Sequence, residues 1–181
     1  AWLADLLLTW ALARRHGASQ LERLADLNLG EMLYWKGDTG GALQLAERAL
    51  SLQTRFSGSD AMTDDALLVA RIQLTRGDRE AATAARSRAG DLETPKVQAL
   101  ARIVDLVLAR ASATEWAQAD KDMPAPYVEL GIEFALWAAR AALDRGDSAA
   151  AGKWLGRARQ RAGARPAWQR QISDLAAYVG E

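Results

Sequence analysis

The feature that most constrains this chain is a short turn that recurs between apolar segments. Glycine and aspartate stand side by side at Gly37-Asp38, at Gly77-Asp78 and at Gly146-Asp147. Glycine readily takes the left-handed conformation that ends a helix, and aspartate caps the helix that follows. The three turns therefore predict three helix–turn–helix hairpins, and such recurrence indicates a repeat architecture.

The spacing of the turns gives the length of the repeat. Gly77 follows Gly37 by 40 residues, and a degenerate third turn at Ala111-Ser112 stands 34 residues after Gly77 and 35 before Gly146. Two antiparallel helices of roughly 12 to 16 residues fill a unit of about 34 residues. The longer first interval therefore indicates a six-residue insertion, which we place in the turn-forming loop at 57–60.

Apolar periodicity between these turns predicts helices throughout, and no segment alternates as a strand does. Thr94-Pro95 is typical of a helix start, because a hydroxyl caps the helix and proline suits its first position. The expected helices cover 2–15, 19–36, 40–55, 62–76, 79–89, 95–110, a short segment ending before 123, 127–145, 148–162 and 166–179.

The bulk composition narrows the class of protein. The 181 residues, half of them apolar, suffice for one domain with a core, here 1–181. Equal numbers of acidic and basic residues favour neither nucleic acid nor an anionic membrane, and no apolar run is long enough to span a membrane. The absence of cysteine fits either cytoplasm or periplasm, and we expect the cytoplasm. The missing initiator methionine indicates a fragment of a longer protein.

Side-chain size follows the repeat. Near the middle of the first helix of three units, a larger residue is followed by a smaller one, at Leu29-Gly30, Val69-Ala70 and Ile103-Val104, and the fourth unit has Ala138-Ala139 at this place. The positions five and twelve after each turn hold Ala42 and Ala49, Ala82 and Ala89, Trp116 and Met123, and Ala151 and Ala158. Small side chains let paired helices approach closely. This pattern resembles the tetratricopeptide repeat (TPR) family, as found in domains appended to bacterial signalling or transcription-regulating proteins.

The resemblance covers four units, at 23–56, 57–96, 97–130 and 131–163. It implies an all-α, right-handed α-solenoid with a leading helix and a C-terminal capping helix at 166–180. The third unit departs from the pattern at its turn and at both small positions, Trp116 and Met123. We therefore expect its second helix to be tilted or irregular.

The resemblance also implies a concave wall made by the first helices. Ten positions before the turns stand Leu27, Leu67, Ala101 and Leu136; six before stand Glu31, Arg71, Asp105 and Arg140; three before stand Tyr34, Leu74, Leu108 and Leu143. Two apolar rows thus flank a row of alternating charge, whose neighbours we expect to pair. The apolar rows are expected to form an exposed strip that binds a partner; the alternative is that the curvature of the superhelix or the leading helix covers the strip. The acidic members of the charged row contradict the cochaperone-type clamp for a peptide carboxyl terminus.

Candidate chemistry is sparse. His16 is the only histidine and has no carboxylate beside it in the sequence to orient it as a base. The acidic pairs Asp64-Asp65 and Asp120/Asp122 have no glycine-rich phosphate loop with them and stand at expected helix ends. We therefore expect neither catalysis nor a metal or cofactor.

Three functional interpretations remain. The first is a non-catalytic scaffold that binds a peptide or a neighbouring domain in its concave groove. The second is a regulatory or dimerising segment of a larger bacterial regulator, a homodimer that uses its outer faces. The third is nucleic-acid contact through a basic stripe of Lys153, Arg157 and Arg161, for which a solvated outer face is the simpler explanation.

Overall fold

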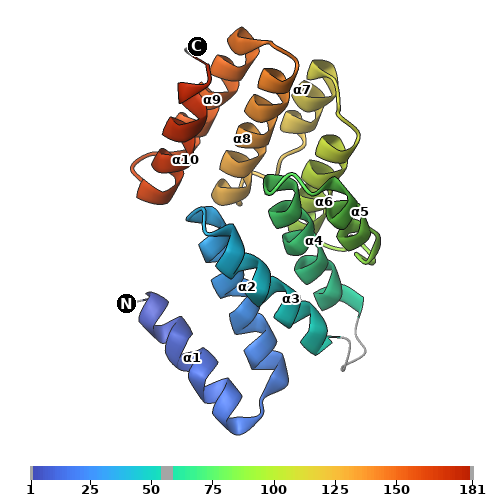
Figure 1. Cartoon of the computed structure of the whole chain (residues 1–181), viewed down its shortest axis with the longest axis vertical. Helices are drawn as coiled ribbons and strands as arrows, with labels where there is room; N and C mark the ends of the chain where they lie inside the picture. Colours follow the sequence, from blue (N-terminus) through green and yellow to red (C-terminus); the bar gives the residue numbers. More distant parts are fainter. Residues whose placement is uncertain (1, 54–58, 180–181) are drawn as a thin grey trace. The chain divides into compact units, whose positions relative to one another are not determined.

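The structure is a computed structural model that describes residues 2–53 and 59–179 (Figure 1). In that part of the chain there are ten α-helices and no strand. They are α1 (Trp2–His16), α2 (Ser19–Trp35), α3 (Thr39–Gln53), α4 (Ser59–Thr75), α5 (Arg79–Ser87), α6 (Pro95–Leu108), α7 (Ala113–Lys121), α8 (Val128–Asp144), α9 (Ser148–Ala162) and α10 (Pro166–Ala177). The predicted all-α fold is confirmed, and the expected helix bounds lie within three residues of these. Of the loop expected at 57–60, residues 57 and 58 lie outside the described residues, and 59 and 60 form the start of α4.

The chain divides into two compact units, Ala1–Glu93 and Thr94–Glu181, where the sequence analysis treats it as one repeat domain. The division falls in the non-helical stretch 88–94, just before the start of α6. Thr94 caps α6 as predicted, because its hydroxyl accepts a hydrogen bond from the backbone N–H of Val97 at 3.2 Å. We call the two parts unit 1 and unit 2 and describe each by itself.

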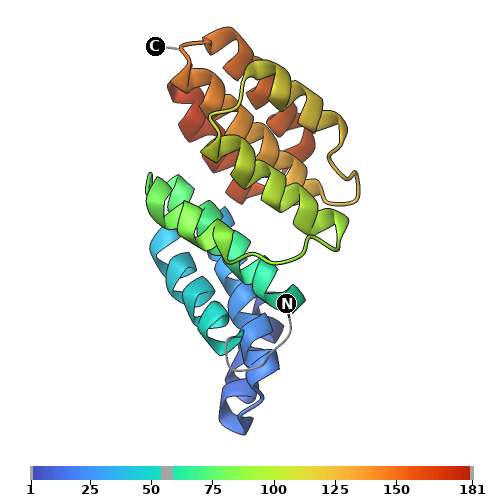
Figure 2. The same ribbon diagram turned by 90° about the vertical axis from the view of Figure 1, so that its right-hand side faces the viewer.

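In unit 1, α2 pairs with α3 and α4 pairs with α5, while α1 lies against α2 (Figure 1). In unit 2, α8 packs against α9 and also touches α6, α7 and α10 (Figure 2). Most residues of α8 between Leu130 and Ala142 are buried, so this helix forms the centre of unit 2.

The three Gly-Asp turns have the predicted geometry. Gly77 has φ +81°, and the N–H of Asp78 donates to the carbonyl of Gln73 at 2.9 Å. The carboxylate of Asp78 then accepts from the N–H of Ala81 at 2.9 Å and caps α5. The other two turns repeat this arrangement at Gly37, Asp38 and Gly41, and at Gly146, Asp147 and Ala150.

The third turn departs from the sequence analysis in register. Arg110, rather than Ala111, occupies the left-handed position, with φ +52°. Ala111 then stands between this residue and Ser112, the cap of α7, whereas in the Gly-Asp turns the capping residue directly follows the left-handed one. Ser112 and Glu115 bond reciprocally, with Ser112 N–H to Glu115 Oε2 at 2.8 Å and Glu115 N–H to Ser112 Oγ at 3.3 Å. These bonds lower the pKa of Glu115.

The small positions allow close helix pairing where they are occupied by small residues. A Cβ on Gly30 would lie 3.3 Å from the carbonyl oxygen of Ala42, so α2 and α3 approach as closely as the pattern predicts. In the third hairpin the fully buried Trp116 takes such a position. Its ring packs edge-on against Phe134 at 5.1 Å between centroids. The helix α7 also packs less extensively against α6 than α3, α5 and α9 pack against their preceding helices.

Candidate functional site

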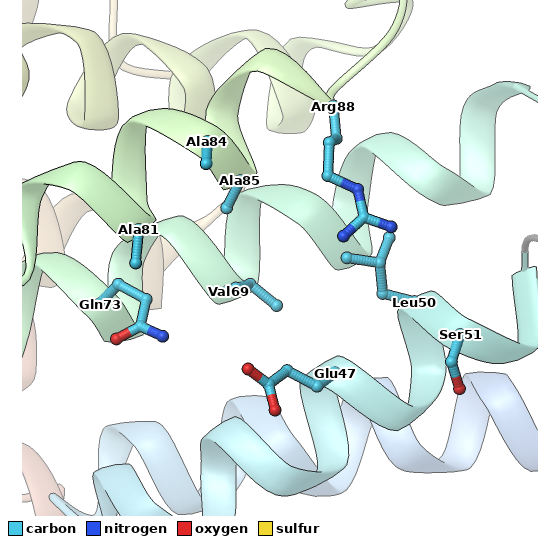
Figure 3. A pocket seen from close by; sticks show the side chains of 9 residues that line it. All are labelled: Glu47, Leu50, Ser51, Val69, Gln73, Ala81, Ala84, Ala85 and Arg88. Atoms are coloured by element: carbon cyan, nitrogen blue, oxygen red, sulfur yellow. The ribbon is translucent and has the colours of Figure 1, made fainter.

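An open groove of about 400 Å³ lies in unit 1 between α3 and α5, with α4 beneath it (Figure 3). Helical spacing places its lining residues, because positions three and four apart share one face of a helix. They are Glu47, Leu50 and Ser51 on α3, Val69 and Gln73 on α4, and Ala81, Ala84, Ala85 and Arg88 on and at the end of α5. We call this site the α3–α5 groove.

The floor of the α3–α5 groove is apolar. Leu50, Val69 and Ala85 are buried and close it from below. Ala81 and Ala84 bring the backbone of α5 near the groove surface, because their side chains end at Cβ (Figure 3). A partner could therefore approach this helix closely while covering an apolar surface.

The walls of the α3–α5 groove carry opposite charges. Glu47 projects from α3 toward the groove, and Arg88 reaches over Leu50 from the end of α5 (Figure 3). Both side chains are exposed, and neither enters an ion pair within residues 2–53 and 59–179. Together they can receive one basic and one acidic group of a bound molecule.

The expected concave-wall residues lie mostly inside the protein. The buried ones are Leu27, Tyr34, Leu67, Arg71, Leu74, Ala101 and Leu136; the half-buried ones are Glu31, Asp105, Leu108, Arg140 and Leu143. The expectation of an exposed apolar strip is therefore wrong, because packing already covers most of these side chains. Their role in binding a partner stays a prediction. The exposed leucines of α2 are instead Leu21 and Leu24.

The expected charge pairing is confirmed for one pair of the row. Arg71 Nη2 of α4 donates to Glu31 Oε1 of α2 at 2.9 Å, and its guanidinium carbon lies 5.3 Å from the centroid of the Tyr34 ring. In unit 2, the guanidinium of Arg140 lies over the ring of Trp137 at 4.8 Å. The contacts of Arg71 join α4 to α2, whereas the contact of Arg140 with Trp137 lies within α8.

Two further buried carboxylates bind charged or polar partners: Asp26, which the sequence analysis missed, and Asp65, which it noted only as one of an acidic pair at an expected helix end. Asp26 accepts from Trp10 Nε1 and from Arg48 Nε, both at 2.7 Å, and so links α1, α2 and α3. Asp65 accepts from Arg23 Nη1 at 2.9 and 3.0 Å, while its burial raises its pKa to about 6. Their burial could have been inferred from the sequence, because Asp26 and Asp65 each stand next to apolar residues within an expected helix, at 25–27 and at 65–70. These bonds give both carboxylates structural partners.

The expected basic stripe is largely occupied by contacts within unit 2. Arg157 Nη1 and Arg161 Nη2 donate to the two oxygens of Asp120 at 2.7 and 3.0 Å. The guanidinium of Arg157 also lies over the ring of Trp154 at 4.5 Å. Lys153 is exposed. Asp120 therefore offsets part of the positive charge of the two arginines, and nucleic-acid contact through Lys153, Arg157 and Arg161 stays a prediction.

Two smaller hollows lie in unit 2 beside the turn at Met123 and Pro124, with volumes of about 230 and 240 Å³. Across the part of the chain that is described, no three histidine or acidic side chains gather as a metal site would require. Nor does any helix there combine the length and the apolar character needed to cross a bilayer. Of these three hollows, the α3–α5 groove combines a buried apolar floor with an exposed acidic and an exposed basic side chain.

Comparison with known proteins identifies no relative of this chain. No protein-family model matches the chain, and no significant match is found among curated proteins or among solved structures.

Proposed function

We propose that the chain is a non-catalytic protein-interaction module of the TPR-like kind, and that it binds a segment of a partner protein in the α3–α5 groove. The observation that carries this proposal is an apolar floor that remains open between two oppositely charged side chains, Glu47 and Arg88. The helical hairpins are the scaffold that holds these three helices in place. The groove is lined by the second helices α3 and α5 and by the first helix α4, at residues other than those of the concave wall expected from the sequence.

The openness of the groove favours a polypeptide over a small molecule. Small-molecule sites usually enclose most of the ligand surface. A groove that is open between two helices instead suits an amphipathic helix or an extended segment, which covers the floor and continues beyond both ends. The alanines of α5 leave room for such a backbone to approach.

The wall charges define the chemistry of the partner segment. Its central residues are apolar and meet Leu50, Val69 and Ala85. A lysine or arginine on one side of that apolar stretch meets Glu47, and an aspartate or glutamate on the other meets Arg88. Opposite charges at the rim contribute mainly to orientation and specificity, while the buried contacts supply most of the affinity.

The experiment is a selection of displayed peptides on the whole chain, followed by fluorescence anisotropy with the selected peptides. Ala84→Asp places a charge in the groove from an exposed position, so the fold is retained. We expect this variant to weaken binding by about tenfold or more. Thr83→Asp is the matched control, because Thr83 is the preceding residue of α5, is exposed and does not line the groove.

Charge reversal tests the assignment of the walls. Glu47→Lys should select peptides with an acidic residue in place of the basic one, and Arg88→Glu should do the converse. Selected peptides that bind Ala84→Asp as tightly as the unaltered chain would refute the α3–α5 groove as the binding site.

A further inference from the structure

The outer face of α1 carries an unpartnered apolar pair between two charges. Leu8 and Leu12 are 60% and 45% exposed, and Asp5 and Arg15 are exposed as well. At about 100° per residue these four side chains fall within an arc of about 80°. The opposite face holds the buried Ala13, which is 3% exposed, so the arc points away from α2.

The spacing of these four residues is the same when it is read from either end of the helix. Asp5, Leu8, Leu12 and Arg15 are separated by steps of three, four and three residues. When the helix is turned end to end, a charged residue therefore again stands at each end and the two leucines again stand between them. Only the sign of the end charges changes. A second α1 laid antiparallel therefore places Leu8 on Leu12 and Asp5 on Arg15, twice over, about a two-fold axis near residue 10.

We propose that this face joins two copies of the chain as an antiparallel, two-fold dimer through α1. The charges select this arrangement, because parallel helices would place Asp5 against Asp5 and Arg15 against Arg15. Within residues 2–53 and 59–179 neither charge enters an ion pair, so both are available to a second copy.

The face differs from one built for pairing within a helical hairpin. The helix α3, which pairs closely with α2, buries Ala42, Ala46 and Ala49 fully, and alanine allows close approach. The outer face of α1 has leucines and terminal charges instead. These are the features of a wider contact between separate molecules, with ion pairs at its ends that set register.

The dimer is independent of the α3–α5 groove, because the residues of the face are on α1 and those of the groove are on α3, α4 and α5. A single helix pair is a small interface, so a reversible, concentration-dependent dimer is expected.

Analytical ultracentrifugation of the whole chain, from roughly 1 to 500 µM, tests the proposal. The unaltered chain should pass from monomer to dimer. Asp5→Arg alone and Arg15→Asp alone should each weaken the dimer by about tenfold or more, because each reverses two facing pairs. An equimolar mixture of the two variants should restore it as a heterodimer, in which every facing pair is again of opposite sign.

The mixture also controls for folding, since it contains no chain other than the two weakened variants. A chain that stays monomeric over the whole range refutes the dimer. A dimer that persists in both single variants, or one that the mixture does not restore, refutes the assignment of this face.

Discussion

Arg71 and Glu31 form an ion pair between α4 and α2, with Nη2 of the arginine 2.9 Å from Oε1 of the glutamate. Their side chains are only 1% and 12% exposed. Removing two charges from water costs about as much as their attraction returns, so such a pair specifies an arrangement more than it adds stability. Here it fixes the register of α2 against α4.

The first prediction concerns this ion pair. Glu31→Ala removes the carboxylate that faces Arg71 and should lower the free energy of unfolding by about 3 kcal/mol. Arg71→Met should also destabilise, and the double variant should lose less than the two single losses together. Urea unfolding of the unaltered chain and the three variants gives the interaction free energy between the two side chains. Additivity within about 0.5 kcal/mol would show that the two side chains do not interact.

The features of the fold that could be predicted from the sequence are those that a few neighbouring residues specify. Gly77 and Asp78 specify a turn through their own backbone preferences, and Gly30 facing Ala42 needs only two small side chains at the right spacing. Such features are encoded within a few residues. The helices and three of the four turns could therefore be predicted closely.

The candidate site could not be predicted in this way. The α3–α5 groove depends on how far apart α3 and α5 lie over α4, which no single residue specifies. Glu47 and Arg88 are ordinary surface charges in the sequence, and only the structure brings them to one groove. Likewise, Leu27 and Leu67 could be assigned to helices, while their burial depends on packing between helices.

The second prediction concerns the pH dependence of stability. The folded pKa of Asp65 is about 6, above its ordinary value of 3.8, because burial outweighs the opposing effect of Arg23. The folded state therefore holds the proton more tightly, and stability falls as pH rises from about 4 to 7. Over this range, the loss of the Asp65 proton lowers the free energy of unfolding by about 3 kcal/mol. Unfolding of Asp65→Asn over this range should show a flatter profile, and a profile parallel to that of the unaltered chain would contradict the raised pKa.

The third prediction concerns the irregular third turn. Arg110 has φ +52°, a conformation that is costly for residues with a Cβ and readily adopted by glycine. Arg110→Gly should therefore raise the free energy of unfolding by about 1 kcal/mol, measured by thermal unfolding. The control is Ala109→Gly, at the exposed preceding residue, which has an ordinary right-handed conformation and should therefore be destabilised by glycine. A loss of stability in Arg110→Gly would contradict this account of the turn.

The fourth prediction concerns the close pairing of α4 and α5. Ala82 is fully buried on α5, so Ala82→Leu would overpack the contact and destabilise by about 1–3 kcal/mol. Thr83→Leu, at the exposed neighbouring position, should change stability by less than about 0.5 kcal/mol. Equal melting temperatures for the two variants would show that Ala82 does not face α4 in a tight contact.

The most direct test of the central claim, that the α3–α5 groove binds a partner segment, is methyl NMR of the alanine-labelled chain. A selected peptide is titrated into the whole chain. We predict chemical-shift changes at Ala81, Ala84 and Ala85, which line the groove, with little change at Ala158 in unit 2. Changes centred on unit 2, with the three groove methyls unmoved, would contradict the claim.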